Sequence, residues 1–158
     1  MNSMSLENFA SKIVDDIQES ITHEVKRDAE LALINAINKT VYEDKKQYTP
    51  TYNLLDAVEV SNVKIGNGRA TFEVGINATK LIPMPKTPWF WDAHSSISHK
   101  PFQEGLVEVL DQGTQTPNPV YEHEPNKFFD KAFEDIEQNL IVTMAKSLRR
   151  KGWNVSIY

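Results

Sequence analysis

The sequence of 158 residues contains no cysteine, so it can form neither a disulfide framework nor a thiolate metal site. It has no run of about 18 apolar residues, which a membrane-spanning helix needs, and its first residues lack the basic, apolar pattern of a signal peptide. It also lacks an excess of positive charge, because 17 basic and 22 acidic side chains give a net charge of −5. We therefore expect a soluble protein that works where it is made and has no membrane partner.

The acidic balance argues against a sequence-specific DNA-binding protein, which usually carries a basic surface. The basic run Arg149-Arg150-Lys151 lies where a helix is expected to end, and cations stabilise the negative end of the helix dipole. A mildly acidic surface is compatible with DNA that slides past without binding.

Signatures of enzymes are also scarce. There is no Gly-x-Ser-x-Gly elbow, and Gly66-Asn67-Gly68 precedes a predicted strand rather than the helix of a phosphate-binding loop. A carboxylate and histidines at Asp92, His94, His99 and His123 could bind a metal or act as acid and base, but their spacing matches no tight metal signature. We predict no enzymatic activity and no cofactor. A small hydrolase that depends on a metal or on Asp92 and His94 stays open as an alternative.

What the sequence does have is a long amphipathic segment. Apolar residues recur at every fourth position, namely Phe9, Ile13, Ile17, Ile21 and Val25. This spacing predicts an apolar stripe on a helix over residues 5–40, with Ser5 as a plausible N-cap. In a straight helix such a stripe should drift, here toward Ala29, Ala32, Leu33, Ala36 and Ile37.

The length of this helix has a consequence for assembly. At 1.5 Å per residue it would be about 50 Å long, whereas a domain of this size is only roughly 26–30 Å wide. Part of the helix should therefore project, or break near Thr22-His23-Glu24. A projecting apolar stripe needs a cover, which a partner subunit would supply.

The rest of the chain completes a single predicted domain. Alternating residues on both sides of the Gly66-Asn67-Gly68 turn predict a β-hairpin over residues 54–76. A loop rich in proline and aromatic residues follows over 77–101, and then a short helix over 102–112 that Gly113 ends. A C-terminal amphipathic helix is predicted over 126–151, capped by Asn126 and closed by Gly152, with a final strand over 153–158. The expected inner face of this C-terminal helix consists of Phe129, Phe133, Ile136, Leu140, Val142, Met144 and Leu148.

The predicted fold class is therefore α+β, with a small, mainly antiparallel sheet packed against the long N-terminal helix and the C-terminal amphipathic helix.

The order of these parts resembles the head–tail junction proteins of tailed bacteriophages, the neck and tail-completion family. The resemblance rests on a pattern that spans most of the chain: Tyr48 and Tyr52 around a proline turn, Leu54-Leu55-Asp56-Ala57-Val58, the Gly66 to Gly68 turn, His94, Leu106 to Gly113, Asn126 to Phe129, and Leu148 to Gly152. The insertion that carries Trp89-Phe90-Trp91 departs from the family pattern.

This resemblance implies a structural virion protein at the head–tail junction, assembled in the cytoplasm of a host bacterium. It implies a cyclic homo-oligomer of roughly six or twelve copies, at the neck, tail-completion or terminator position. Head-closure or connector proteins would lie on one side and tail tube or terminator proteins on the other, with genomic DNA passing through the lumen without specific binding.

Interface centres use exposed apolar stripes and aromatic residues. We therefore expect the interface residues to be Phe9, Ile13, Ile17, Ile21, Trp89, Phe90 and Trp91. The competing interpretation is that these side chains belong to an ordinary core. A second alternative is a monomeric adaptor whose N-terminal helix docks in a groove of a partner.

Overall fold

The computed structural model describes residues 5–43, 53–66, 69–81, 107–108, 110–113 and 125–157. The helices are α1 (Leu6–Ser20), α2 (Lys26–Ile37), α3 (Asn53–Asp56) and α6 (Phe128–Arg150), with two π-helical segments, η1 (Ile21–Val25) and η2 (Asn38–Tyr42), and the 3-10 turn η3 (Ala78–Lys80). The strands are β1 (Val58–Val60), β2 (Lys64–Gly66), β3 (Arg69–Thr71) and β4 (Val74–Ile76).

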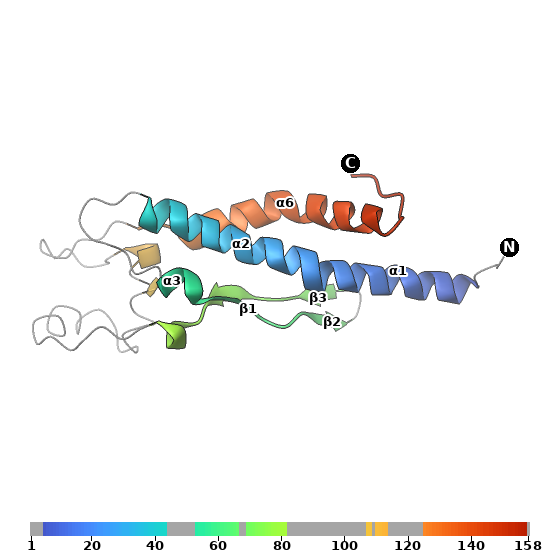
Figure 1. Ribbon diagram of the computed structural model, residues 1–158, viewed down its shortest axis with the longest axis horizontal. Helices are drawn as coiled ribbons and strands as arrows, with labels where there is room; N and C mark the ends of the chain where they lie inside the picture. The colour runs from blue at the N-terminus through green and yellow to red at the C-terminus, as the bar shows by residue number, and fades with distance from the viewer. Residues whose placement is uncertain are drawn as a thin grey trace, which may run out of the picture.

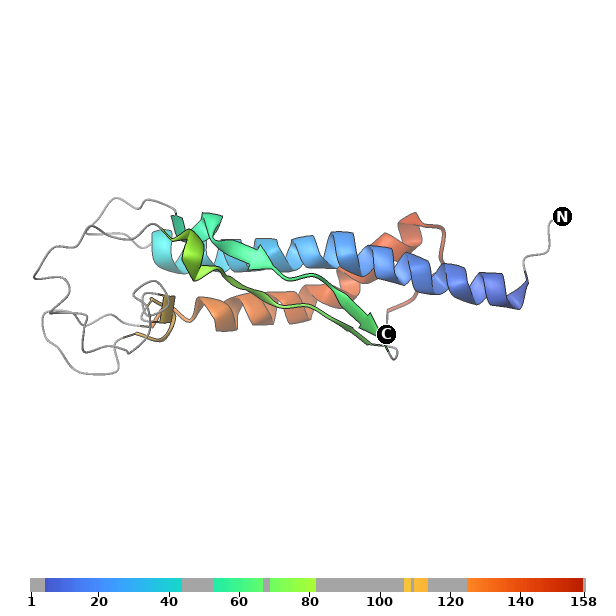
Figure 2. The same cartoon turned by 90° about the horizontal axis from the view of Figure 1, so that it is seen from below.

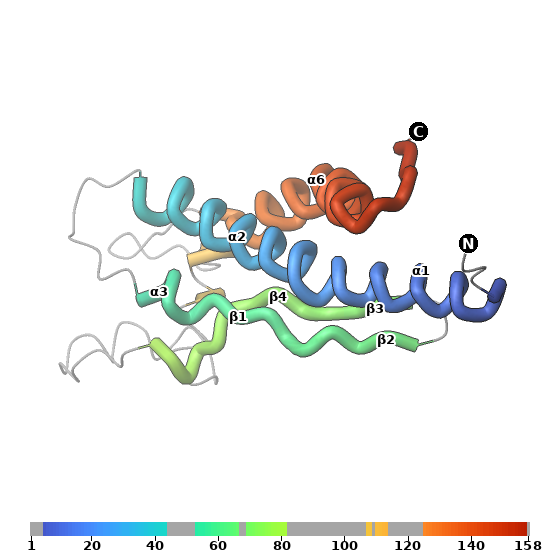
Figure 3. The backbone as a smooth tube through the Cα atoms, turned by 45° about the vertical axis from the view of Figure 1, so that its right-hand side comes forward, coloured from blue at the N-terminus to red at the C-terminus, as the bar shows by residue number. Residues whose placement is uncertain are grey.

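The elements lie in three layers, with α1 and α2 in the middle (Figure 1). Helix α6 runs antiparallel to this continuous helix on one side and makes its most extensive contact with α2 (Figure 3). Strands β1 and β4 pack against α2 on the other side. The predicted α+β class, with a small antiparallel sheet against two long helices, is confirmed. No helix in the described part of the chain is long and apolar enough to cross a membrane.

The N-terminal helix begins where the sequence predicts, since the Asn8 amide donates to Ser5 Oγ over 3.3 Å. It continues to Tyr42, because η1 and η2 join α1 and α2 without a break. Hydroxyl groups at both π segments donate to the carbonyl four residues earlier: Thr22 to Gln18 over 2.8 Å in η1, and Thr40 to Ala36 over 2.8 Å in η2. A carbonyl that accepts from a side chain is less available to the backbone, which favours a local change of helical register.

The π segments explain how a four-residue spacing keeps one face buried. In a straight α-helix, four residues rotate the side-chain direction about the helix axis by about 40° more than a full turn. Each π turn accommodates about one extra residue, which reduces the accumulated rotation by about 100°. The apolar series that starts at Phe9 therefore remains on the core side, where Val25, Ala29, Leu33, Ile37 and Val41 are all buried. Of the two expected outcomes, projection of the helix or a break near Thr22-His23-Glu24, the break does not occur, because that position is the π segment η1 of an unbroken helix.

The hairpin predicted over residues 54–76 is present as two short antiparallel ladders. Strand β1 pairs with β4 in the register Val58↔Ile76, and β2 pairs with β3 in the register Gly66↔Arg69. Its predicted beginning at Leu54 is wrong, because residues 53–56 form the helical turn α3, and Leu54 is buried there.

The start of α6 differs from the prediction. Asn126 is not its N-cap, because Lys127 occupies the cap position with φ 52°. The side-chain Nδ2 of Asn126 instead donates to the Leu110 carbonyl over 2.8 Å. The buried carboxylate of Asp111 accepts from the Phe129 amide over 3.1 Å and so takes the capping role. Residues 107–108 and 110–112 are helical, and Gly113 follows them with φ 76°.

Two further predictions about the C-terminal region need correction. The predicted inner face of α6 is wrong at Phe133, which is 63% exposed, whereas the other six predicted side chains are half-buried. The fully buried side chains of α6 are Phe128, Ala132, Ala145 and Ser147. The final strand expected over 153–158 is absent from residues 153–157, which pair with no other strand. Instead Gly152, at φ 91°, turns the chain back toward α1.

Candidate partner interface

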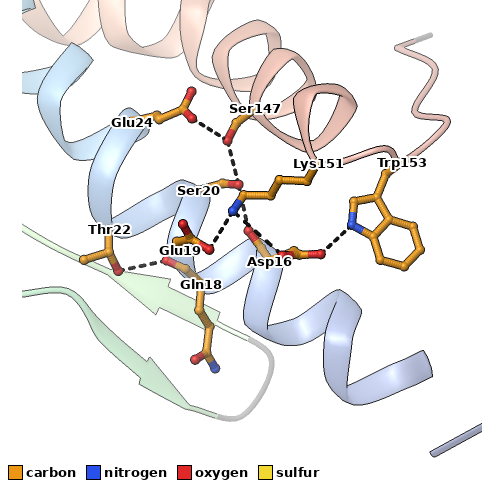
Figure 4. Close-up of polar contacts among 9 residues, drawn as sticks. All are labelled: Asp16, Gln18, Glu19, Ser20, Thr22, Glu24, Ser147, Lys151 and Trp153. Carbon is orange, nitrogen blue, oxygen red and sulfur yellow. Dashed lines mark hydrogen bonds and ion pairs between the residues drawn. The ribbon is translucent and has the colours of Figure 1, made fainter. Parts of the chain in front are cut away.

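Helix α6 crosses the N-terminal helix through small residues. Ser20 and Ser147 are almost completely buried, and their hydroxyl oxygens lie 2.8 Å apart (Figure 4). Ala29 on α2 and Ala145 on α6 are also buried. Small side chains allow two helix backbones to approach closely, so this crossing leaves little room for a larger residue.

The same crossing is tied by polar contacts. The single proton of the Ser147 hydroxyl can be given either to Ser20 Oγ or to Glu24 Oε1, which lies 2.9 Å away, while Ser20 donates to the Asp16 carbonyl over 2.7 Å (Figure 4). Glu24 also forms an ion pair with Arg150. Each buried hydroxyl therefore has a partner, as buried polar groups require.

The basic run at the end of α6 is used within the chain. Arg149 donates through Nε and a terminal nitrogen to the Val155 carbonyl over 2.9 and 2.7 Å. The Lys151 ammonium lies 2.6 Å from Glu19 Oε2, and this hydrogen bond raises the pKa of Lys151 above its usual 10.5. With Arg150 paired to Glu24, these cations hold α6 and the C-terminal tail in place, which disfavours a role in binding phosphate.

Trp153 fastens the C-terminal tail to α1. Its indole Nε1 donates to Asp16 Oδ2 over 2.8 Å (Figure 4). Its ring meets that of Phe9 edge-on, with centroids 5.4 Å apart. Lys12 Nζ lies 5.9 Å from the centroid of the same ring. The sequence did not reveal this contact, because Trp153 was assigned to a strand.

The predicted stripe on α1 remains largely uncovered. Phe9 is 45% exposed even with Trp153 against it, and Ile13, Ile17 and Ile21 are only half-buried. One turn earlier Leu6 is 85% exposed, and Ser20 is the only buried residue of α1. Both the first view and the view from below show the N-terminal half of α1 extending past the sheet and past α6 (Figures 1 and 2).

A second apolar surface is an open groove of about 450 Å³ between α6, α2 and the sheet, here called the α6 groove. It is lined by Leu33, Phe72, Val74, Phe129, Asp130, Ala132, Phe133 and Ile136. Phe133 is the most exposed of the large side chains that line it. The sequence did not indicate this surface, because Phe133 was expected on the inner face of α6.

The other candidate residues are placed as follows. Trp89, Phe90, Trp91, Tyr48, Tyr52 and Gly68 lie outside the described residues, as do Asp92, His94, His99 and His123. Of the remaining family-pattern residues, Leu54 is buried, Leu55 is half-buried and Gly66 ends β2. Gly113 and Gly152 both have positive φ just past helical segments, a conformation that favours glycine.

Within the residues that the structure describes, no three His, Cys, Asp or Glu side chains are grouped so that they could hold a metal ion. Neither the family models, nor the curated proteins, nor the solved structures give a match to this chain.

Proposed function

We propose that this chain is a structural subunit of the head–tail connector of a tailed bacteriophage. Copies form a ring at the neck, tail-completion or terminator position. The ring joins head-closure proteins to the tail, and the genome passes through its lumen. The chain acts there as a building block and not as an enzyme.

The observation that carries this proposal is the exposed apolar stripe at the projecting end of α1. Fully burying a large aliphatic or aromatic side chain is worth roughly 1.5–3 kcal/mol, and Leu6, Phe9 and Val14 are 85%, 45% and 50% exposed. Covering these three side chains would therefore contribute a few kcal/mol to an association. A subunit that is completed by its neighbours has such a surface, and a self-sufficient monomer has less reason to keep one.

Two other features support the proposal. The sequence pattern resembles the neck and tail-completion proteins along most of its length, and the positive φ of Gly113 and Gly152 is compatible with the helix-ending glycines of that pattern. The net charge of −5 suits a wall that DNA must pass without adhering, because like charges repel.

Genetic removal tests the proposal. If the gene is deleted from the genome that encodes it and lytic growth is induced, electron microscopy should show DNA-filled heads and separate tails. Supplying the wild-type gene from a plasmid should restore joined particles. Normal tailed particles from the deletion strain would contradict the proposed function.

The same stripe also favours a second candidate, a monomeric adaptor whose α1 docks in the groove of another protein. An adaptor should sediment as a monomer at every concentration, whereas a ring subunit should form larger species as the concentration rises. The hydrolase alternative receives no support from geometry, since Asp92 and His94 lie outside the described residues.

A further inference from the structure

The α6 groove is an apolar surface that the chain does not fill with any described segment. Its wall on α6 runs from Phe129 to Ile136, which spans about 10 Å along a helix. Phe72 and Val74 form the opposite wall, and Leu33 on α2 also lines it. An elongated apolar groove of this kind suits two turns of an amphipathic helix.

The α1 end of the same chain has matching dimensions. Leu6, Phe9 and Ile13 follow the i, i+3, i+7 spacing of a helix that lies in a groove, and they span about 10 Å. Lys12 flanks these residues, and Asp130 is the one charged side chain among the described residues that line the groove. Within the described part of the chain Asp130 takes part in no ion pair. The two surfaces therefore match in length and in apolar character, and Lys12 and Asp130 carry opposite charges.

One molecule cannot bring these surfaces together. The helix from Leu6 to Tyr42 is continuous and carries both Ile13, at the projecting end, and Leu33, in the groove. Twenty residues at 1.5 Å each separate them by about 30 Å, and Figure 3 shows no fold in between. An α1 end that occupies the groove therefore belongs to another copy.

We propose that the projecting end of α1 of one copy docks in the α6 groove of the next copy, around Phe133. The contact joins two different surfaces, so it is heterologous, and repetition generates either a closed ring or an open filament. This inference rests on the proposed ring and names the contact that builds it.

The area of this contact is compatible with a subunit that assembles only as part of a ring. The exposed part of each large apolar side chain contributes on the order of 100 Å², so the α1 anchors and the groove lining give roughly 600 Å² of apolar surface. Interfaces are roughly 57% apolar, which puts the total near 1,000 Å², the lower limit for a stable interface. One contact alone is weak, whereas in a closed ring every copy makes two.

The experiment uses two variants that each inactivate one surface. Leu6→Asp/Ala10→Asp adds two charges to the apolar side of α1, and its matched control Asn8→Asp/Ser11→Asp adds the same charges to the polar side, where both residues are exposed. Phe133→Asp alters the groove, and Ile141→Asp is its control, because Ile141 is equally exposed on α6 at 60% but does not line the groove. All six substituted positions are exposed, so folding should be retained, which circular dichroism checks.

Sedimentation velocity then gives distinct outcomes. The α1 variant and the groove variant should each associate at least about 100-fold more weakly than wild type, because a carboxylate would enter an apolar contact. Both controls should assemble like wild type. An equimolar mixture of the two inactive variants should form a heterodimer and nothing larger, since one retains a groove and the other an α1 end.

The contact is overturned if Phe133→Asp assembles like Ile141→Asp, if the mixture stays monomeric, or if wild type is monomeric up to about 1 mM, where an interface of this size should be populated. If the Phe133→Asp variant still forms closed rings, the result would support the proposed connector ring and exclude this contact. A heterodimer in the mixture together with open filaments from wild type would support the contact and contradict the ring.

Discussion

The crossing of α6 over the N-terminal helix makes a quantitative prediction for Ser147. In Ser147→Ala the lost hydrogen bond is worth about 0.5–1.5 kcal/mol, and no buried partner is stranded, because Ser20 still donates to the Asp16 carbonyl and Glu24 still pairs with Arg150. Ser147→Leu loses the same hydrogen bond and adds carbon atoms where the neighbouring hydroxyl is 2.8 Å away. Overpacking of this kind costs about 1–3 kcal/mol more. We therefore expect losses of about 1 kcal/mol for alanine and 2–4 kcal/mol for leucine.

Urea unfolding measures both values, and hydrogen exchange shows where the damage lies. In the leucine variant the amides of α1 should exchange faster, whereas the β1–β4 ladder, which packs on α2, should keep its protection. If alanine and leucine have the same free energy of unfolding within about 0.5 kcal/mol, the two helices do not cross at close range and the reasoning is wrong.

Three other predictions concern the core, the α6 cap and the alkaline limit. Phe128→Ala should cost about 3–5 kcal/mol in urea unfolding because Phe128 is fully buried, and a loss below about 1 kcal/mol would exclude it from the core. Asp111→Ala should cost about 1–2 kcal/mol by removing the acceptor of the Phe129 amide, while Asp111→Asn should retain most of the stability; equal losses would argue against capping. The hydrogen bond to Glu19 raises the pKa of Lys151 in the folded protein. The contribution of this hydrogen bond to the free energy of unfolding is therefore complete below pH 10.5 and is lost as the pH rises through the higher folded pKa. The difference in urea midpoint between wild type and Lys151→Met should therefore be constant from about pH 7 to 9 and shrink above 10.5; a difference that is unchanged at high pH would contradict this assignment.

Much of the fold could be predicted from local patterns. The four-residue spacing that begins at Phe9 predicted the long helix, and the glycine turn at Gly66 predicted the hairpin. The π segments η1 and η2 were not predicted, although the hydroxyls of Thr22 and Thr40 lie at them. A strict spacing of four, rather than 3.6, combined with such hydroxyls is a local signal that could have indicated a π segment.

The features of the C-terminal region that were not predicted have a different cause, because they depend on contacts between residues far apart in the sequence. Asp111 caps a helix that begins at Phe128, and Trp153 contacts Asp16 at the other end of the chain. Local periodicity contains no information about either contact. The same limitation hid the groove around Phe133, since its second wall is provided by the sheet. The assignment of the α1 stripe to an interface followed from the helix length and the apolar spacing, and it stays a prediction.

In the proposed ring, other copies cover the exposed apolar side of α1. Sedimentation velocity of the wild-type chain from micromolar to millimolar concentration, followed by electron microscopy of the largest species, tests it most directly. We expect a concentration-dependent cyclic assembly with a central channel, in which the amides of residues 6–14 exchange more slowly than in the monomer. A ring in which those amides exchange as fast as in the monomer, or a chain that stays monomeric throughout, would contradict it.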